Sequence, residues 1–216
     1  MSGRPLSTPA TLARDKSRGP DPQVGQTLLR LRLFGHMRAE DGEGRSILPR
    51  TRKTRAVLAI LALSSPRPVL RLQLTGLLWS QREKDQARAS LRQAVHELQD
   101  TLSVSMTRLL VAERHHLALK SEGVWVDVLD ATRVEGANAD SLDCFLSPLL
   151  ADLVGLDPGF DQWLQGEQKR LLGIARVIGD RVLADQAVGV FVSGFDSYVS
   201  YGYAAGTELR EIASPF

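Results

Sequence analysis

The sequence predicts an α+β fold, in which a small sheet, three helices and a β-hairpin are followed by a helical region. Strand-like alternation and helical periodicity occur in that order, and the two halves of the chain carry opposite charge. Residues 28–120 contain 17 Lys and Arg against 8 Asp and Glu, about +9, whereas residues 121–216 contain 6 against 15, about −9. This asymmetry indicates two regions with partners of different character.

The first elements are expected to be extended. Residues 1–27 are rich in Pro, Gly, Ser and Thr, which predicts a disordered leader. In "LLRLRLFGHMRAE", Leu29, Leu31 and Leu33 alternate with arginines, as in a half-buried strand. "DGEGR" is typical of a turn, and "SILP" of a short second strand.

Three helices should follow. "TRKTRAVLAILALSS" has an apolar stripe and a candidate N-cap in Thr51 or Thr54, and "SPRP" ends it. "VLRLQLTGLLWS" predicts a shorter helix. "DQARASLRQAVHELQDTL" predicts a third helix, whose apolar residues fall on one side of a helical wheel. These residues are Ala87, Leu91, Ala94, Val95, Leu98 and Leu102.

A β-hairpin is predicted after the third helix. "RLLVAERHHLALK" alternates around a charged turn near residues 113–115, and "GVWVDV" adds an extended piece. A sheet, three helices and a hairpin, in this order, make the plan of a winged helix, which would occupy residues 28–127.

A winged helix can place its third helix in the major groove of DNA, where Arg and Gln reach base edges while other basic residues bind phosphates. The exposed face of the third helix would carry Arg88, Arg92, Gln93 and His96. The start of the first helix would carry Arg50, Arg52, Lys53 and Arg55, and the hairpin would carry Arg114 and His115, with His116 beside them. These are the candidate DNA-binding residues, although an arginine-rich helix face is more often simply solvated.

Other kinds of site find little support in the sequence. The adjacent His115 and His116 would point to opposite faces of a strand, so we expect no metal site and no cofactor. Cys144 is the single cysteine, which excludes a disulfide within the chain, and we expect it to pack in a helix. The phosphate-binding loops and nucleophile motifs of common enzyme classes do not occur, so we expect no enzyme.

Four segments together resemble the OmpR-type winged helix of bacterial transcriptional activators of the antibiotic-regulator type. They are "LRLFG", "LPRTRKTRAVLAILALSSPRPVLRLQLTGLLW", "ARASLRQAVHELQDTL" and "LLVAERHHLAL", and the likeness runs from Leu28 to Asp127. The resemblance implies a third helix in the major groove and a hairpin on the neighbouring minor groove or backbone. It also implies that residues 81–84 correspond to a loop that can touch RNA polymerase in related regulators.

The acidic half predicts helices over "DSLDCFLSPLLADLVGL" and "DPGFDQWLQGEQKRLLGIARVIGDRVLADQAV". Here the chain resembles the opening of the bacterial transcriptional activator domain, an array of tetratricopeptide-like helix pairs used for contacts between proteins. We expect an incomplete α-helical domain at residues 128–188, because such arrays need about three repeats and few residues remain. Residues 189–216 could be an ordered cap, a loose tail or the remnant of a truncated reading frame.

These patterns predict a sequence-specific, DNA-binding transcriptional regulator with double-stranded DNA as its partner. The alternative is a winged-helix adaptor, or the regulatory front end of a larger signalling protein, acting through protein contacts. A homodimer is compatible with the sequence, although no coiled-coil heptad specifies one. With no signal peptide and no apolar run of membrane-spanning length, we expect a cytoplasmic protein without a membrane partner.

Overall fold

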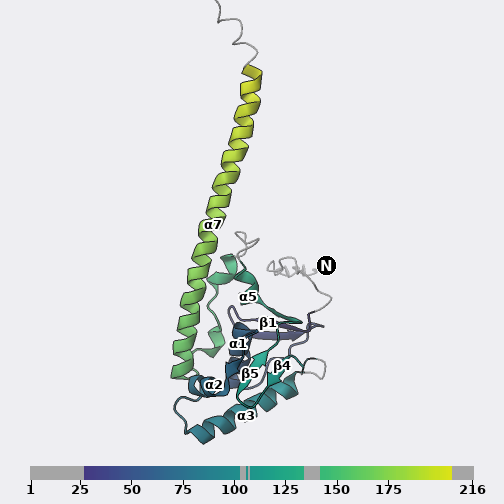
Figure 1. Ribbon diagram of the computed structural model, residues 1–216, viewed down its shortest axis with the longest axis vertical. Coiled ribbons are helices and arrows are strands. Elements are labelled where there is room, and N and C mark those ends of the chain that lie inside the picture. Colours follow the sequence, from purple (N-terminus) through teal and green to yellow (C-terminus); the bar gives the residue numbers. More distant parts are fainter. Residues whose placement is uncertain (1–26, 103–105, 107, 134–141, 206–216) are drawn as a thin grey trace, which may run out of the picture.

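The computed structural model describes residues 27–102, 106, 108–133 and 142–205, with side chains up to Ala184. Residues 1–26 of the predicted leader and residues 206–216 of the predicted tail lie outside the described residues. The described part is a mixed α+β body with two small sheets, from which one long helix extends (Figure 1).

The first sheet has the strand order β2-β1-β6. β1 (Leu29–Arg32) pairs antiparallel with β2 (Arg38–Asp41) and parallel with β6 (Val124–Val126). The predicted alternating strand is therefore two strands, and the break includes Gly35, whose φ of 73° suits glycine. The predicted strand "SILP" supplies a single bridge, from Ser46 to Glu40.

The predicted three helices are α1 (Arg52–Ser64), α2 (Arg71–Leu78) and α3 (Lys84–Thr101). α1 is covered on most sides, because every residue from Ala56 to Leu63 is buried. All six residues of the stripe predicted for the third helix are buried, which confirms that this face packs on the core.

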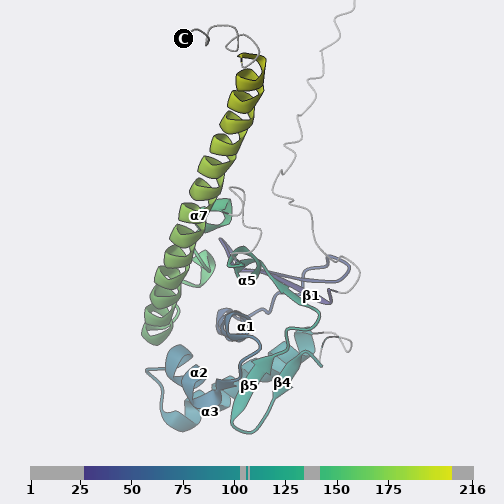
Figure 2. The same cartoon turned by 45° about the horizontal axis from the view of Figure 1, so that its top comes forward.

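The second sheet forms the hairpin beside α3 (Figure 2). Its strand order is β3-β5-β4, and β5 (His116–Leu119) pairs antiparallel with both β3 (Val69–Leu70) and β4 (Leu110–Ala112). The turn falls at residues 113–115, as predicted from the sequence. Leu117 and Leu119 are buried, which fixes the hairpin against the helices.

A short helix, α5 (Asp127–Ala131), follows β6 and carries a buried carboxylate. Asp127 accepts hydrogen bonds from the backbone N–H groups of Leu33, Phe34 and Val128 at 2.7–3.1 Å. Burial raises the pKa of Asp127, and these hydrogen bonds oppose the rise. The carboxylate thereby joins the end of β1 to α5.

The predicted helix over "DSLDCFLSPLLADLVGL" is wrong from residue 144 onward, whereas residues 142–143 are helical. Residues 144–153 form only two short 3-10 turns, η1 (Cys144–Leu146) and η2 (Ala151–Leu153). Pro148 separates them, and the backbone of residues 148–151 pairs with the chain at Leu33 and Gly35 instead of with itself. The apolar spacing had a different cause: Leu149, Leu150 and Leu153 are buried in the hydrophobic core although they do not lie on a helix face.

Cys144 also differs from its prediction. It is exposed at the start of η1 and forms no packed helix. In place of the cysteine, Phe145 turns inward and meets the ring of Phe34 edge-on, with centroids 5.3 Å apart. An aromatic ring, and not the cysteine, therefore makes the apolar contact between this segment and the core.

The last element, α7 (Pro158–Ala205), is a single helix of 48 residues. It starts against α2 and extends far beyond the rest of the described chain (Figure 1). No proline follows Pro158 until Pro215, so nothing of that kind breaks the helix where the tail was predicted to begin. Within the described residues α7 has no partner helix of a tetratricopeptide pair, and no helix there is long and apolar enough to cross a membrane.

Candidate nucleic-acid interface

The exposed face of α3 is entirely polar. Ala87, Leu91 and Leu98 anchor the helix to the core, and the opposite side bears the residues predicted to meet DNA. Arg88, Arg92, Gln93 and His96 are all exposed there. The structure therefore brings the four helix candidates together on one solvent-facing surface.

Two of these four side chains have acidic neighbours on the same helix. Arg88 forms an ion pair with Asp85 at 3.3 Å, and His96 Nδ1 lies 2.8 Å from Asp100 Oδ2. Both pairs are well exposed, so they contribute little to stability and can be exchanged for other partners. Within the described part of the chain, Arg92 and Gln93 have no side-chain hydrogen bond or ion pair.

Glu97 fixes α3 relative to the start of α1. Its carboxylate accepts hydrogen bonds from the N–H and hydroxyl of Thr51 at 2.9 and 2.7 Å, and from the Thr54 hydroxyl at 2.7 Å. Thr51 is the N-cap of α1, so Glu97 supplies the negative charge that a helix start favours. Burial acts to raise the pKa of Glu97, but the hydrogen bonds outweigh burial, and the pKa is lowered.

The hairpin tip adds a second cationic element beside α3. Arg114 and His115 are exposed at the turn, whereas His116 is partly buried in β5. The adjacent histidines therefore differ in environment, as expected for neighbours on a strand. Among the described residues, no group of three His, Cys, Asp or Glu side chains is arranged to hold a metal ion.

Arg71 is a cationic residue that the sequence analysis did not select. It is the first residue of α2, where its N–H donates to the His115 carbonyl at 2.9 Å and its Nε donates to the Glu113 carbonyl at 2.8 Å. A positive side chain is unfavourable at a helix N-terminus. This unfavourable position is the signal by which Arg71 could have been selected. Burial lowers the pKa of Arg71, and the positive charge of Arg92 lowers it further.

Arg52 and Arg55, predicted to bind phosphate, contact the acidic half of the chain. Arg52 donates from Nε and Nη2 to the Asp152 carbonyl at 3.2 and 3.0 Å, and from Nη2 to the Val154 carbonyl at 3.0 Å. Arg55 donates to the Pro49 carbonyl at 2.7 Å and lies 3.8 Å from the Asp152 carboxylate. Both arginines therefore already have partners within the chain.

Lys53 is engaged in the same way. Its ammonium group donates to the Leu78 carbonyl, lies 3.5 Å from the Asp157 carboxylate and sits 5.4 Å from the centre of the Trp79 ring. Asp157 is buried and also accepts from the Ser80 hydroxyl at 2.6 Å. Of the four basic residues at the start of α1, Arg50 alone is exposed without a side-chain partner among the described residues.

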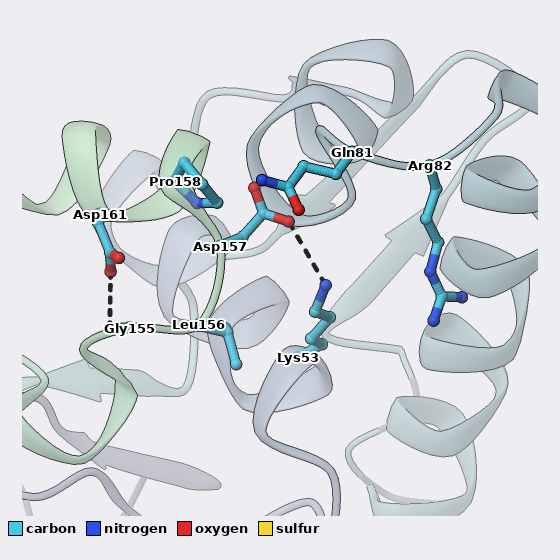
Figure 3. A pocket seen from close by; sticks show the side chains of 8 residues that line it. All are labelled: Lys53, Gln81, Arg82, Gly155, Leu156, Asp157, Pro158 and Asp161. Atoms are coloured by element: carbon cyan, nitrogen blue, oxygen red, sulfur yellow. Dashed lines mark hydrogen bonds and ion pairs between the residues drawn. The ribbon is translucent and has the colours of Figure 1, made fainter.

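A cavity of about 500 Å³ lies at this junction, between the start of α1, the loop before α3 and the start of α7 (Figure 3). Lys53 points toward Asp157 inside it, and Asp161 turns away to accept from the Gly155 N–H at 2.9 Å. Arg82, on the other wall, donates to the Ser90 hydroxyl at 2.9 Å. The charged side chains that line this cavity have hydrogen-bond or ion-pair partners within the chain. The cavity is therefore part of the junction between the basic and the acidic half.

Comparison with solved structures gives a likeness of fold. The solved structure of Mycobacterium tuberculosis EmbR in complex with a low-affinity phosphopeptide is similar, with a TM-score of 0.57 and 21% sequence identity. The match covers 83% of this chain and 51% of that one, so this chain spans about half the length of its structural neighbour. At this identity the likeness concerns the fold alone. No family model and no curated protein matches the sequence.

Proposed function

We propose that this protein is a sequence-specific, DNA-binding transcriptional regulator of the OmpR type, which places α3 in the major groove. The observation that carries the proposal is the composition of the exposed face of α3, where Arg92 and Gln93 stand without internal partners. Both side chains have the geometry to read base edges from a helix in the groove. The fold likeness to EmbR supports a regulator of this type.

The hairpin would contact the DNA backbone on one side of α3 through Arg114 and His115, both exposed at its tip. Arg88 and His96 would exchange their exposed acidic neighbours for phosphate or base contacts. Arg50, at the start of α1, keeps its proposed role as a phosphate contact. Arg52, Lys53 and Arg55 are weaker candidates, because DNA would have to replace contacts that they already make.

The alternative, an adaptor acting through protein contacts, predicts apolar residues on the free face of the third helix. Every fully exposed residue of α3 is polar, which favours DNA over a protein groove. We also propose RNA polymerase as a partner of the exposed loop at residues 81–84, and a homodimer as the working assembly. Neither of these proposals is needed for DNA binding by α3.

The test begins with selection of bound duplexes from a random DNA pool, followed by affinity measurements on the selected sequence and on an unrelated one. Arg92→Ala should cost about 1–3 kcal/mol on the selected duplex and reduce the preference over the unrelated one. Arg176→Ala, which removes an exposed arginine from α7, is the matched control and should leave both affinities unchanged. Failure of the wild-type chain to bind any duplex in dilute salt would overturn the proposal.

A further inference from the structure

One face of the first sheet is rich in arginine. Side chains alternate between the two faces of a strand, and residues paired across strands share a face. Leu29 and Leu31 of β1 are buried in the core, so the residues that alternate with them lie on the outer face. By the register of the sheet, this outer face carries Arg30 and Arg32 of β1, Arg38 and Glu40 of β2, and Trp125 of β6. We call these five residues the arginine face.

Two donor atoms of the arginine face are buried without an acceptor. Within the described chain, Arg32 Nε and Trp125 Nε1 have no hydrogen-bond partner. Neither group can accept a hydrogen bond, so each needs an acceptor oxygen. Buried polar groups in proteins are nearly always paired, and an unpaired donor is unfavourable. Because both side chains as a whole are only partly buried, small rotations would bring them to an acceptor that lies on the sheet.

The charges of this face are also poorly balanced. Arg32 stands directly opposite Arg38 across β1 and β2, where like charges repel. Arg38 is exposed, and among the described residues its side chain has no hydrogen bond or ion pair. The charge of Arg32 acts to lower the pKa of Asp127, but the oxygen atoms of that carboxylate already accept from backbone N–H groups. Glu40 is the single acidic side chain of the five, so donors outnumber acceptors.

The ring of Trp125 is engaged on its face and not at its edge. The guanidinium carbon of Arg30 lies 5.4 Å from the centre of this ring, a cation–π contact. The indole N–H points outward in the plane of the ring, so this contact does not use it. The ring is therefore held in place while its donor stays available for an external acceptor.

The arginine face lies away from the candidate DNA-binding helix. Figures 1 and 2 both show β1 and α3 on opposite sides of α1. A duplex bound along α3 would therefore leave the arginine face free for a different partner. Carboxylates match guanidinium groups in shape and charge, and a peptide also brings backbone carbonyls that can accept from an indole N–H. An acidic peptide segment supplies both kinds of acceptor.

We propose that the arginine face binds an acidic segment of a partner protein. Its carboxylates lie on Arg32 and Arg38, and one of its oxygen atoms accepts from Trp125 Nε1. The segment gives both buried donors the acceptors that they lack in the free chain. It also separates the like charges of β1 and β2 by placing negative charge between them. This inference stands beside the proposed function and does not rest on it.

The test starts from a pool of short peptides rich in Asp and Glu, screened against the full chain in dilute salt. The selected peptide is compared with its neutral counterpart, in which every Asp is Asn and every Glu is Gln. The acidic peptide should bind more tightly at low salt than at high salt, and the neutral one should not bind. Saturating the chain with a duplex that it binds should leave the affinity for the peptide unchanged.

Three variants locate the peptide on the chain. Trp125→Phe removes the indole N–H but keeps an aromatic ring, and Arg38→Gln removes an exposed positive charge. Each should bind the peptide roughly tenfold more weakly. Arg92→Gln is the matched control, because it removes an exposed positive charge from α3 and should bind the peptide as the wild type does. Thermal unfolding of Trp125→Phe is measured as well, and Arg38→Gln keeps the test open if the smaller ring destabilises the sheet.

The outcomes are distinct from those of the DNA-binding test. Weaker peptide binding in Trp125→Phe and Arg38→Gln, with wild-type binding in Arg92→Gln, would support the proposal. No binding of any acidic peptide, wild-type affinity in both sheet variants, or an equal loss in Arg92→Gln would overturn it. Displacement of the peptide by a short single strand of DNA would assign the face to nucleic acid and also overturn it. Arg38→Gln should bind duplex DNA as the wild type does, so either proposal can fail while the other stands.

Discussion

Two groups of cations in the same basic half of the chain have opposite surroundings. The junction cations, Arg52, Lys53 and Arg55 at the start of α1, face the acidic half and bond to its carbonyls and carboxylates. The interface cations, the exposed Arg92 on α3 and the partly buried Arg71 at the start of α2, have no carboxylate partner within the described residues. A cluster of positive charge in a sequence therefore does not identify its partner, because the partner can be the rest of the chain.

The contacts of the junction cations also account for part of the opposite charge of the two halves of the chain. Asp152 and Asp157 belong to the acidic half, and they lie against cations of the basic half. Asp152 additionally accepts from the Met37 N–H at 2.8 Å, so this carboxylate ties the first sheet to α1. The segment between residues 148 and 161 is thus part of the body that carries α3. Its removal should affect stability before it affects DNA recognition.

The largest expected effect tests whether the start of α7 belongs to the core. Phe160 is fully buried, so Phe160→Ala should lower the free energy of unfolding by about 3–5 kcal/mol. Urea unfolding measures the loss, and DNA affinity corrected for the folded fraction should stay unchanged. Leu183→Ala, at an exposed position of the same helix, is the control and should change stability by less than about 0.5 kcal/mol. Equal effects at both positions would contradict the junction described here.

A smaller effect is expected where α7 approaches α2 most closely. A Cβ atom at Gly159 would lie 2.8 Å from the Gly76 carbonyl oxygen and 3.1 Å from that of Leu77. Gly159→Ala should therefore destabilise the protein by about 1–3 kcal/mol. Gly166→Ala, where a Cβ would meet nothing within 4 Å, should stabilise α7 by about 0.5–1 kcal/mol. The same sign at both glycines in thermal unfolding would argue against the close approach.

Glu97, which joins α3 to the start of α1, should give a pH-dependent effect. Because its pKa is lowered in the folded state, its contribution is present above its ordinary pKa of 4.5 and is lost as the pH falls further. Glu97→Gln should cost about 1–2 kcal/mol at neutral pH and show a flatter loss of stability below pH 4.5. The raised pKa of Asp127 acts in the opposite sense, so the difference between variant and wild type isolates Glu97. Parallel stability curves for the two proteins would contradict this assignment.

The smallest effect on DNA binding should come from a junction cation. Arg52→Gln removes hydrogen bonds to the carbonyls of Asp152 and Val154, so we expect a loss of roughly 0.5–1.5 kcal/mol in stability. The salt dependence of DNA binding should stay that of the wild type. A decrease of about one unit in the salt slope would instead place Arg52 at the phosphate backbone, as the sequence alone predicted.

The sequence predicted the elements whose apolar periodicity reports burial directly. The stripe of α3, the strand around Leu31 and the hairpin before His116 all appear where the pattern indicated. The segment around Pro148 misled the prediction, because Leu149, Leu150 and Leu153 are buried although their backbone is irregular and bonds to the residues that follow β1. Helical spacing cannot distinguish this case from a helix, since both place several leucines on one side.

The candidate interface was predictable in part. Arg88, Arg92, Gln93 and His96 lie together because one helix period places them there. Arg71 could not be predicted in this way, since its bond to the Glu113 carbonyl depends on how α2 and the hairpin meet. Arg52 and Asp152 are 100 residues apart in sequence, and no local pattern predicts a contact between them.

The length of α7 gives it leverage over the site from which it starts. A helix of 48 residues spans about 72 Å at 1.5 Å per residue, and its start is held where Gly159 meets the backbone of Gly76 and where Phe160 is buried. A pivot of only about 10° at that start would sweep the far end through about 12 Å. Conversely, a small force applied far along α7 would produce a large torque at the start of this helix, beside the loop before α3.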